Sequence, residues 1–64
     1  MKPRDERAAV VDALARVVIE LEERVDQYAL ADAKESVERV ARDLGIHPYD
    51  VYDRVGEIDE EAAA

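Results

Sequence analysis

Ser36 and His47 are the only residues suited to nucleophilic catalysis, because the chain contains no Thr and no Cys. A hydroxyl nucleophile needs an activating base beside it, and one Ser with one His offers little choice for such a site. A single His without Cys provides no recognisable zinc site either. The seventeen Asp and Glu residues make chance carboxylate pairs unavoidable, and no glycine-rich phosphate loop accompanies them. We therefore predict no enzymatic activity, no metal site and no cofactor.

The charge balance bears on the kind of partner. Seventeen acidic residues against nine basic ones give a formal net charge of -8, which opposes simple binding to nucleic-acid phosphates. The abundance of Ala, Val, Asp and Glu, with Arg preferred to Lys, resembles the composition of proteins from salt-loving archaea. That resemblance implies a halophilic protein working near molar salt. There the Debye length falls to about 3 Å, so net charge no longer decides association.

The chain is short for an independent domain. A 64-residue chain buries only about 60% of its unfolded surface, which leaves a monomer marginally stable. Without Cys there is no disulfide, so we predict a homodimer. No run approaches the roughly 20 apolar residues of a membrane span, and the first seven residues are too charged to begin a secretory signal. We expect a soluble, cytoplasmic protein.

A long amphipathic helix is predicted over residues 4–29, where neither Gly nor Pro interrupts the chain. At 1.5 Å per residue, about 25 residues span roughly 38 Å, which is longer than the helices predicted after it. The overhang predicts a two-fold contact with the same helix of a second subunit. A compatible alternative is that this helix is simply the first core helix of a three-helix domain. The residues predicted for the dimer interface are Val10, Leu14, Val17, Val18, Leu21 and Val25.

Two shorter helices are predicted to follow. Asp32 with Glu35 three residues later matches a relaxed capping box, which places a break at 30–32 and a helix at 33–44. Pro48 suits a first helical turn and Gly56 a helix end, so the third helix is predicted at 48–55 with His47 as its cap. The acidic tail 57–64 is predicted to fray beyond Ile58. The expected fold is a single all-α domain of three helices.

Residues 37–56 carry the most informative pattern. Ala41, Gly45, Ile46, Val51 and Val55 have the types and spacing of a helix-turn-helix. Over these twenty residues the chain resembles the helix-turn-helix DNA-binding domains of the phage repressor and Cro class. In that class the small residue at the Ala41 position lets the helices approach, the Gly45 position turns the chain, and the last three positions fill the angle between the helices.

The outward side chains of the third helix define the candidate site. The resemblance implies a dimeric transcriptional regulator with the third helix in the major groove of duplex DNA. Asp50 and Asp53 depart from the usual Arg, Lys, Gln and Asn of such a surface, although Asp can accept from cytosine N4. The alternative is a protein-interaction module that uses the Tyr and Asp face or the long apolar stripe. The residues assigned to DNA binding are Lys34, Arg39, Arg42, His47, Tyr49, Tyr52, Asp53 and Arg54.

Overall fold

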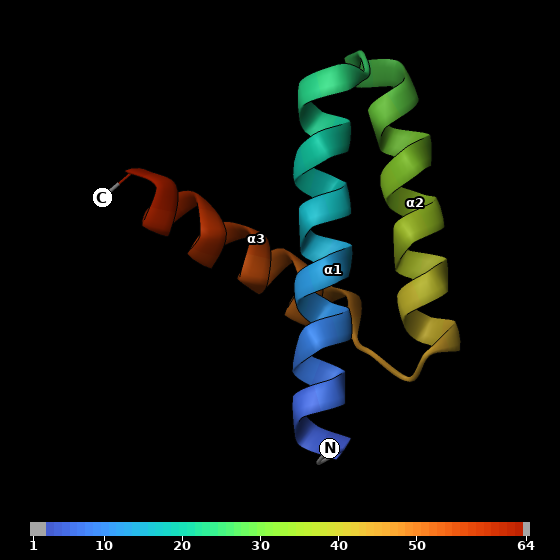
Figure 1. Cartoon of the computed structure of the whole chain (residues 1–64). Helices are drawn as coiled ribbons and strands as arrows, with labels where there is room; N and C mark the ends of the chain where they lie inside the picture. The colour runs from blue at the N-terminus through green and yellow to red at the C-terminus, as the bar shows by residue number, and fades with distance from the viewer. Residues whose placement is uncertain (1–2, 64) are drawn as a thin grey trace.

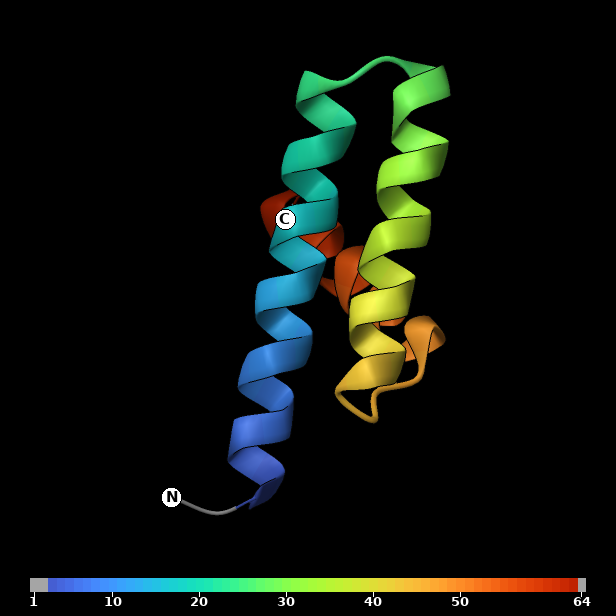
Figure 2. The ribbon, with the colours of Figure 1, turned by 90° about the vertical axis from the view of Figure 1, so that its right-hand side faces the viewer.

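A computed structural model describes residues 3–63, with the side chains from Glu6 onward. Within this range the chain forms three helices and no strand: α1 (Pro3–Arg24), α2 (Gln27–Asp43) and α3 (Pro48–Ala63). Helices α1 and α2 run antiparallel and side by side (Figures 1 and 2), and α3 crosses behind α1 in Figure 1 and extends beyond it. The predicted all-α architecture of three helices is confirmed.

The turn between α1 and α2 lies earlier than predicted. Helix α1 ends at Arg24, and Asp26 caps α2 by accepting a hydrogen bond from the Ala29 backbone N–H at 2.9 Å. Asp32 lies inside α2, where its carbonyl accepts a bond from the Ser36 hydroxyl at 3.2 Å. Asp26 and Asp32 are both acceptable N-caps, and the chain uses the one that leaves two helices of similar length to pair.

The turn between α2 and α3 lies where the sequence predicts it. Gly45 has φ +76°, its N–H donates to the Arg42 carbonyl at 3.0 Å, and the Ile46 N–H donates to the Ala41 carbonyl at 2.8 Å. These two bonds form a Schellman motif, in which Gly supplies the left-handed conformation. His47 then caps α3, because its Nδ1 atom accepts from the Tyr49 backbone N–H at 3.2 Å.

Helix α3 is about twice as long as predicted. It continues through Gly56 to Ala63, so the prediction that Gly56 ends the helix and that the tail frays beyond Ile58 is wrong for the described residues. The φ of Gly56 is not positive, whereas a C-terminal cap would need it to be. Arg54 holds Glu57 one turn further along the helix at 3.0 Å, and Ile58 packs on the core. Ala64 lies outside the described residues.

The core forms where the three helices meet, and it consists of small and β-branched residues. Ala41, Ile46 and Val51 of the turn region are buried, and Val55 is partly buried against them. Helix α1 closes this angle with Ala15 and Val18. Val18 is 0% exposed, so it fills the chain's own core and is unavailable for the dimer contact predicted for it. The buried residues are Ala15, Val18, Val37, Ala41, Ile46 and Val51.

Candidate functional site

A shallow depression of about 590 Å³ lies at the turn between α2 and α3. We call it the turn depression. It brings together four of the eight residues assigned to DNA binding, namely Arg42, His47, Tyr49 and Tyr52. The other lining residues are Arg7, Glu38, Gly45, Ile46 and Pro48.

Tyr49 and His47 form an aromatic pair at this depression. Their ring centroids lie 5.1 Å apart with the ring planes inclined by 19°, which is a stacked arrangement. The His47 ring is held because its Nδ1 atom accepts the bond that caps α3. Tyr49 is nevertheless 73% exposed. The pair therefore offers a pre-positioned aromatic surface to a partner.

Tyr52 has a structural role between α2 and α3. Its hydroxyl donates to a Glu38 carboxylate oxygen at 2.9 Å, and the other oxygen of Glu38 faces the Arg42 guanidinium at 3.5 Å. Burial of the ring, with the neighbouring Glu38 carboxylate as the second cause, raises the pKa of Tyr52 to about 12. The ring of Tyr52 is partly buried and its hydroxyl is bonded to Glu38, so the residue joins α2 to α3, and its assignment to DNA binding stays a prediction.

Arg7 is a member of this site that sequence reasoning did not identify. Its guanidinium lies 3.6 Å from the Asp50 carboxylate of α3, and both side chains remain about half exposed. Arg7 is far from Asp50 in the sequence and has no motif around it. Only the packing of α1 on α3 brings it to the depression.

Arg54 and Asp53 line a second depression, between α1 and α3. Arg54 donates to Asp12 at 2.9 Å and to Glu57 at 3.0 Å, and it lies 3.7 Å from Glu61. These carboxylates, Asp12 first, raise the pKa of Arg54. Its Nε and Nη1 atoms therefore bind carboxylates of α1 and α3, and the assignment of Arg54 to DNA binding stays a prediction.

Asp12 is the acceptor that joins α1 to α3 in this second depression. It accepts from Arg16 on its own helix and from Arg54, each at 2.9 Å. The hydrogen bond from Arg16, followed by that from Arg54, holds the pKa of Asp12 below its ordinary value. Its ionised form therefore stabilises the crossing of the two helices.

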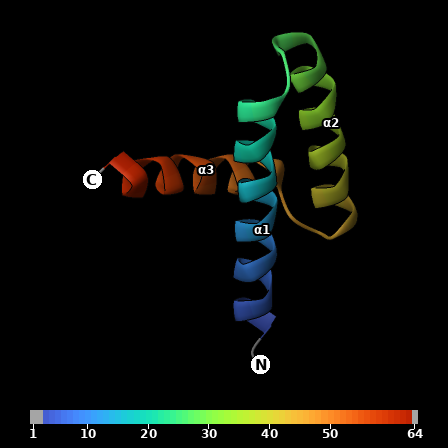
Figure 3. The same cartoon turned by 45° about the horizontal axis from the view of Figure 1, so that its top comes forward.

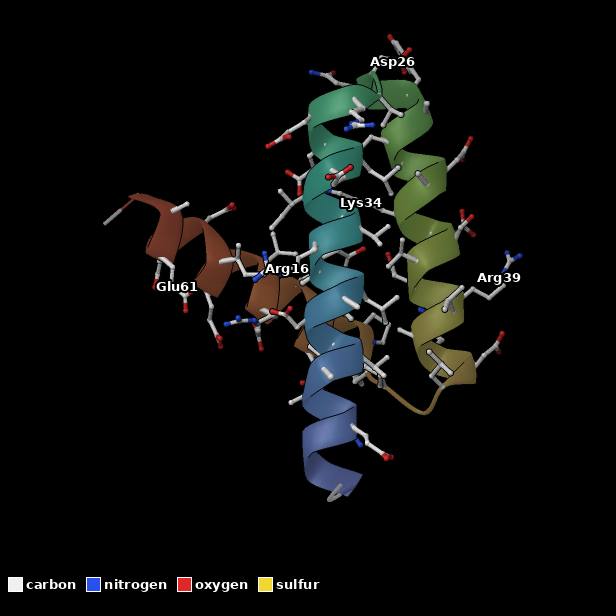
Figure 4. The ribbon with its side chains drawn as sticks, viewed as in Figure 1. Arg16, Asp26, Lys34, Arg39 and Glu61 are labelled. Atoms are coloured by element: carbon white, nitrogen blue, oxygen red, sulfur yellow. The ribbon has the colours of Figure 1, made fainter. Side chains whose placement is uncertain are left out.

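The remaining two candidate residues lie on α2 away from both depressions. Lys34 is half-buried and precedes Val37 by three positions, which puts it on the helix face that packs inward. Arg39 is exposed, and Figure 4 shows it extending from the side of α2 that faces away from α1. The eight predicted residues therefore lie on separate surfaces and do not form one continuous cationic face.

Within residues 3–63, no group of three His, Cys, Asp or Glu side chains has the placement of metal ligands. None of the three described helices has both the length and the hydropathy needed to cross a membrane. What the turn depression offers is an exposed aromatic pair beside arginines that already face carboxylates.

Comparison with protein-family models, with curated proteins and with solved structures finds no significant match to this chain.

Proposed function

We propose that the chain is a protein-interaction module that binds a basic polypeptide segment at the turn depression. The observation that carries the proposal is the exposed Tyr49 ring, stacked on His47 beside a ready-made hollow. Tyrosine is enriched among the residues that dominate protein interfaces, since it supplies a large contact area at low entropic cost. A segment with an apolar or aromatic side chain would cover this ring.

The charge of the whole chain, rather than that of the depression itself, favours a cationic partner. Arg7 faces Asp50 and Arg42 faces Glu38, so the two arginines of the depression are balanced by carboxylates. Asp53 is exposed on the same helix, and the whole chain carries a formal charge of -8. A field of this sign attracts a basic segment and repels a phosphate backbone.

Duplex DNA is the second candidate partner. The observation that favours it is the burial of Ala41, Ile46 and Val51 in the manner of the phage repressor and Cro class. Under this second candidate function the chain is a transcriptional regulator. His47 and Tyr49 would lie near base edges, and Arg39 and Arg42 near phosphates.

Two parallel selections test the proposal, one from a displayed random peptide library and one from a pool of random duplex DNA. Both are made at the same KCl concentrations, from 0.1 M to molar. We expect enrichment of peptides that combine Lys or Arg with an aromatic or aliphatic residue. Enrichment of a duplex sequence without such peptides would establish the regulator instead, and no enrichment in either selection would rule against both.

A matched pair of tyrosine variants then locates the binding surface. Tyr49→Ala is expected to raise the peptide Kd at least tenfold, which is about 1.4 kcal/mol. Tyr28→Ala serves as the control, because Tyr28 is 88% exposed at the opposite end of α2. Equal losses of affinity in the two variants would show that the peptide does not bind at the turn depression.

A further inference from the structure

Helices α1 and α2 share an apolar face that α3 leaves uncovered. We call it the hairpin face and define it by Val10, Leu14, Val17 and Leu21 on α1, Val40 on α2 and Leu44 at the C-terminal cap of α2. Val17, Val40 and Leu44 are 46%, 46% and 57% exposed. In Figures 1 and 3, α3 passes behind α1 and no helix lies in front of the α1–α2 pair.

Two cross-helix bonds establish that this face points away from α3. Asp12 marks the α3 side of α1, through its bond to Arg54, and Glu38 marks the α3 side of α2, through its bond to Tyr52. At 100° per residue, the four α1 residues of the hairpin face lie about 140° to 180° from Asp12. Val40 lies about 160° from Glu38. Val17 and Val40, which are 46% exposed, therefore project from the opposite side of the hairpin. Leu44, about 120° from Glu38, borders this face. Val10, Leu14 and Leu21 lie beneath it and also pack partly on the core.

A shallow groove borders the hairpin face along the flank of α1 that faces away from α2. The groove, of about 410 Å³, runs beside Val17 and Leu21, and Arg16, Glu20 and Arg24 form its rim. Arg24 and Glu20 face each other at 3.6 Å, and both are largely exposed. An apolar floor with a charged rim is the usual composition of a protein interface.

The accessible surface of the chain is too large for a compact monomer of its mass. A 7.2 kDa chain with this fold exposes 4903 Å². The general scaling of surface with mass gives about 4,100 Å² for a compact monomer of this size. The excess of about 800 Å² equals the area that one partner buries in a standard protein interface.

We propose that the hairpin face binds the hairpin face of a second copy in a two-fold dimer, with both α3 helices on the outside. The Cα extents of the chain are 37 × 32 × 16 Å, so it is a thin slab. If two slabs pack through this face, the shortest extent doubles and becomes about equal to the two longer extents. The arrangement buries the same apolar patch on both subunits, as a two-fold contact requires.

The distribution of charge permits this contact despite the net charge. Helix α3 carries six acidic residues and one Arg, a balance of -5 out of the -8 of the whole chain. Helix α3 crosses behind α1 and its acidic second half projects sideways beyond α1 (Figure 1), so most of the like charge lies outside the α1–α2 contact. The turn depression also stays open on each subunit. The dimer inference is independent of the proposed function, although it would make that binding bivalent.

Sedimentation equilibrium of the full chain tests the dimer from 1 to 500 μM, in 0.1 M and in molar KCl. We expect a particle of twice 7.2 kDa that dissociates on dilution. Val17→Glu and Leu44→Glu are each expected to give monomers that retain their helical circular dichroism, because both side chains are already largely exposed in the single chain. Tyr28→Glu, at an exposed site off the hairpin face, should remain a dimer.

Either of two results would overturn the inference. One is a monomeric mass for the unmodified chain across the whole concentration range. The other is a dimer that persists in folded Val17→Glu and Leu44→Glu, since a carboxylate cannot be buried in an apolar contact without a large loss of affinity. The use of two variants on two helices keeps the test decisive if one of them fails to fold.

Discussion

The two glycines of the chain have opposite expected responses to the same substitution. Gly45 lies at the turn between α2 and α3 with φ +76°, whereas Gly56 lies within α3. A Cβ atom added at either position meets no neighbouring atom within 4 Å. Steric clash therefore contributes to neither variant, and backbone conformation alone decides the sign of the change in stability.

Gly45→Ala forces an L-residue into the left-handed region, at a cost of about 1–2 kcal/mol. Part of this is offset because Ala restricts the unfolded chain, which leaves a net loss of about 1 kcal/mol. Gly56→Ala replaces a helix-interior Gly and should stabilise the protein by about 0.5–1 kcal/mol. For a domain of this size the two melting temperatures should differ by roughly 10 °C.

Thermal unfolding followed by circular dichroism measures both variants beside the unmodified chain. Protein concentration is held constant, because the stability of a dimer depends on it. A lower melting temperature for Gly56→Ala would contradict the reasoning, since it would mean that Gly56 ends the helix in a left-handed conformation. An unchanged value for Gly45→Ala would contradict the assigned turn geometry.

Three further predictions concern the core and the bonds between helices. Val18→Ala removes two fully buried methyl groups and should lower the free energy of unfolding by about 2 kcal/mol in urea titrations, more if the cavity fails to collapse. Tyr52→Phe should cost about 1 kcal/mol at neutral pH. It should also remove the loss of stability expected as pH rises from 10.0 to about 12, because a raised pKa favours the protonated hydroxyl. The lowered pKa of Asp12 means that its ionised form stabilises the folded chain, and this stabilisation is lost as the carboxylate is protonated in acid. The difference in stability between the unmodified chain and Asp12→Asn should therefore vanish as pH falls below 3.8.

The sequence predicted the features that local chemistry decides. Gly45 followed by an apolar residue and Pro48 specifies a helix end, a turn and a helix start within a few residues, and the structure has all three. Ala41 and Val51 are buried, which is what the resemblance to the phage repressor and Cro class implies, whereas helical spacing alone did not predict the exposure of Val40 and Leu44. At the turn the signal and its consequence lie within a few residues of each other.

The sequence did not predict the features that distant packing decides. Asp26 and Asp32 offer equivalent caps, and only the pairing of α1 with α2 selects between them. Gly56 matches a helix end, but the bond of Arg54 to Glu57 and the packing of Ile58 carry the helix past it. The role of Arg54 was missed for the same reason, because its partner Asp12 lies 42 residues away.

The absence of long flexible side chains from the buried core affects how much conformational freedom folding removes. Each fully buried side chain is Ala, Val or Ile within the described residues. Such side chains give up between zero and about 1 kcal/mol of rotamer entropy on burial, compared with about 1.5–2 kcal/mol for Met. Fixing these six side chains therefore costs little conformational entropy, and a small core can hold the three helices in one arrangement.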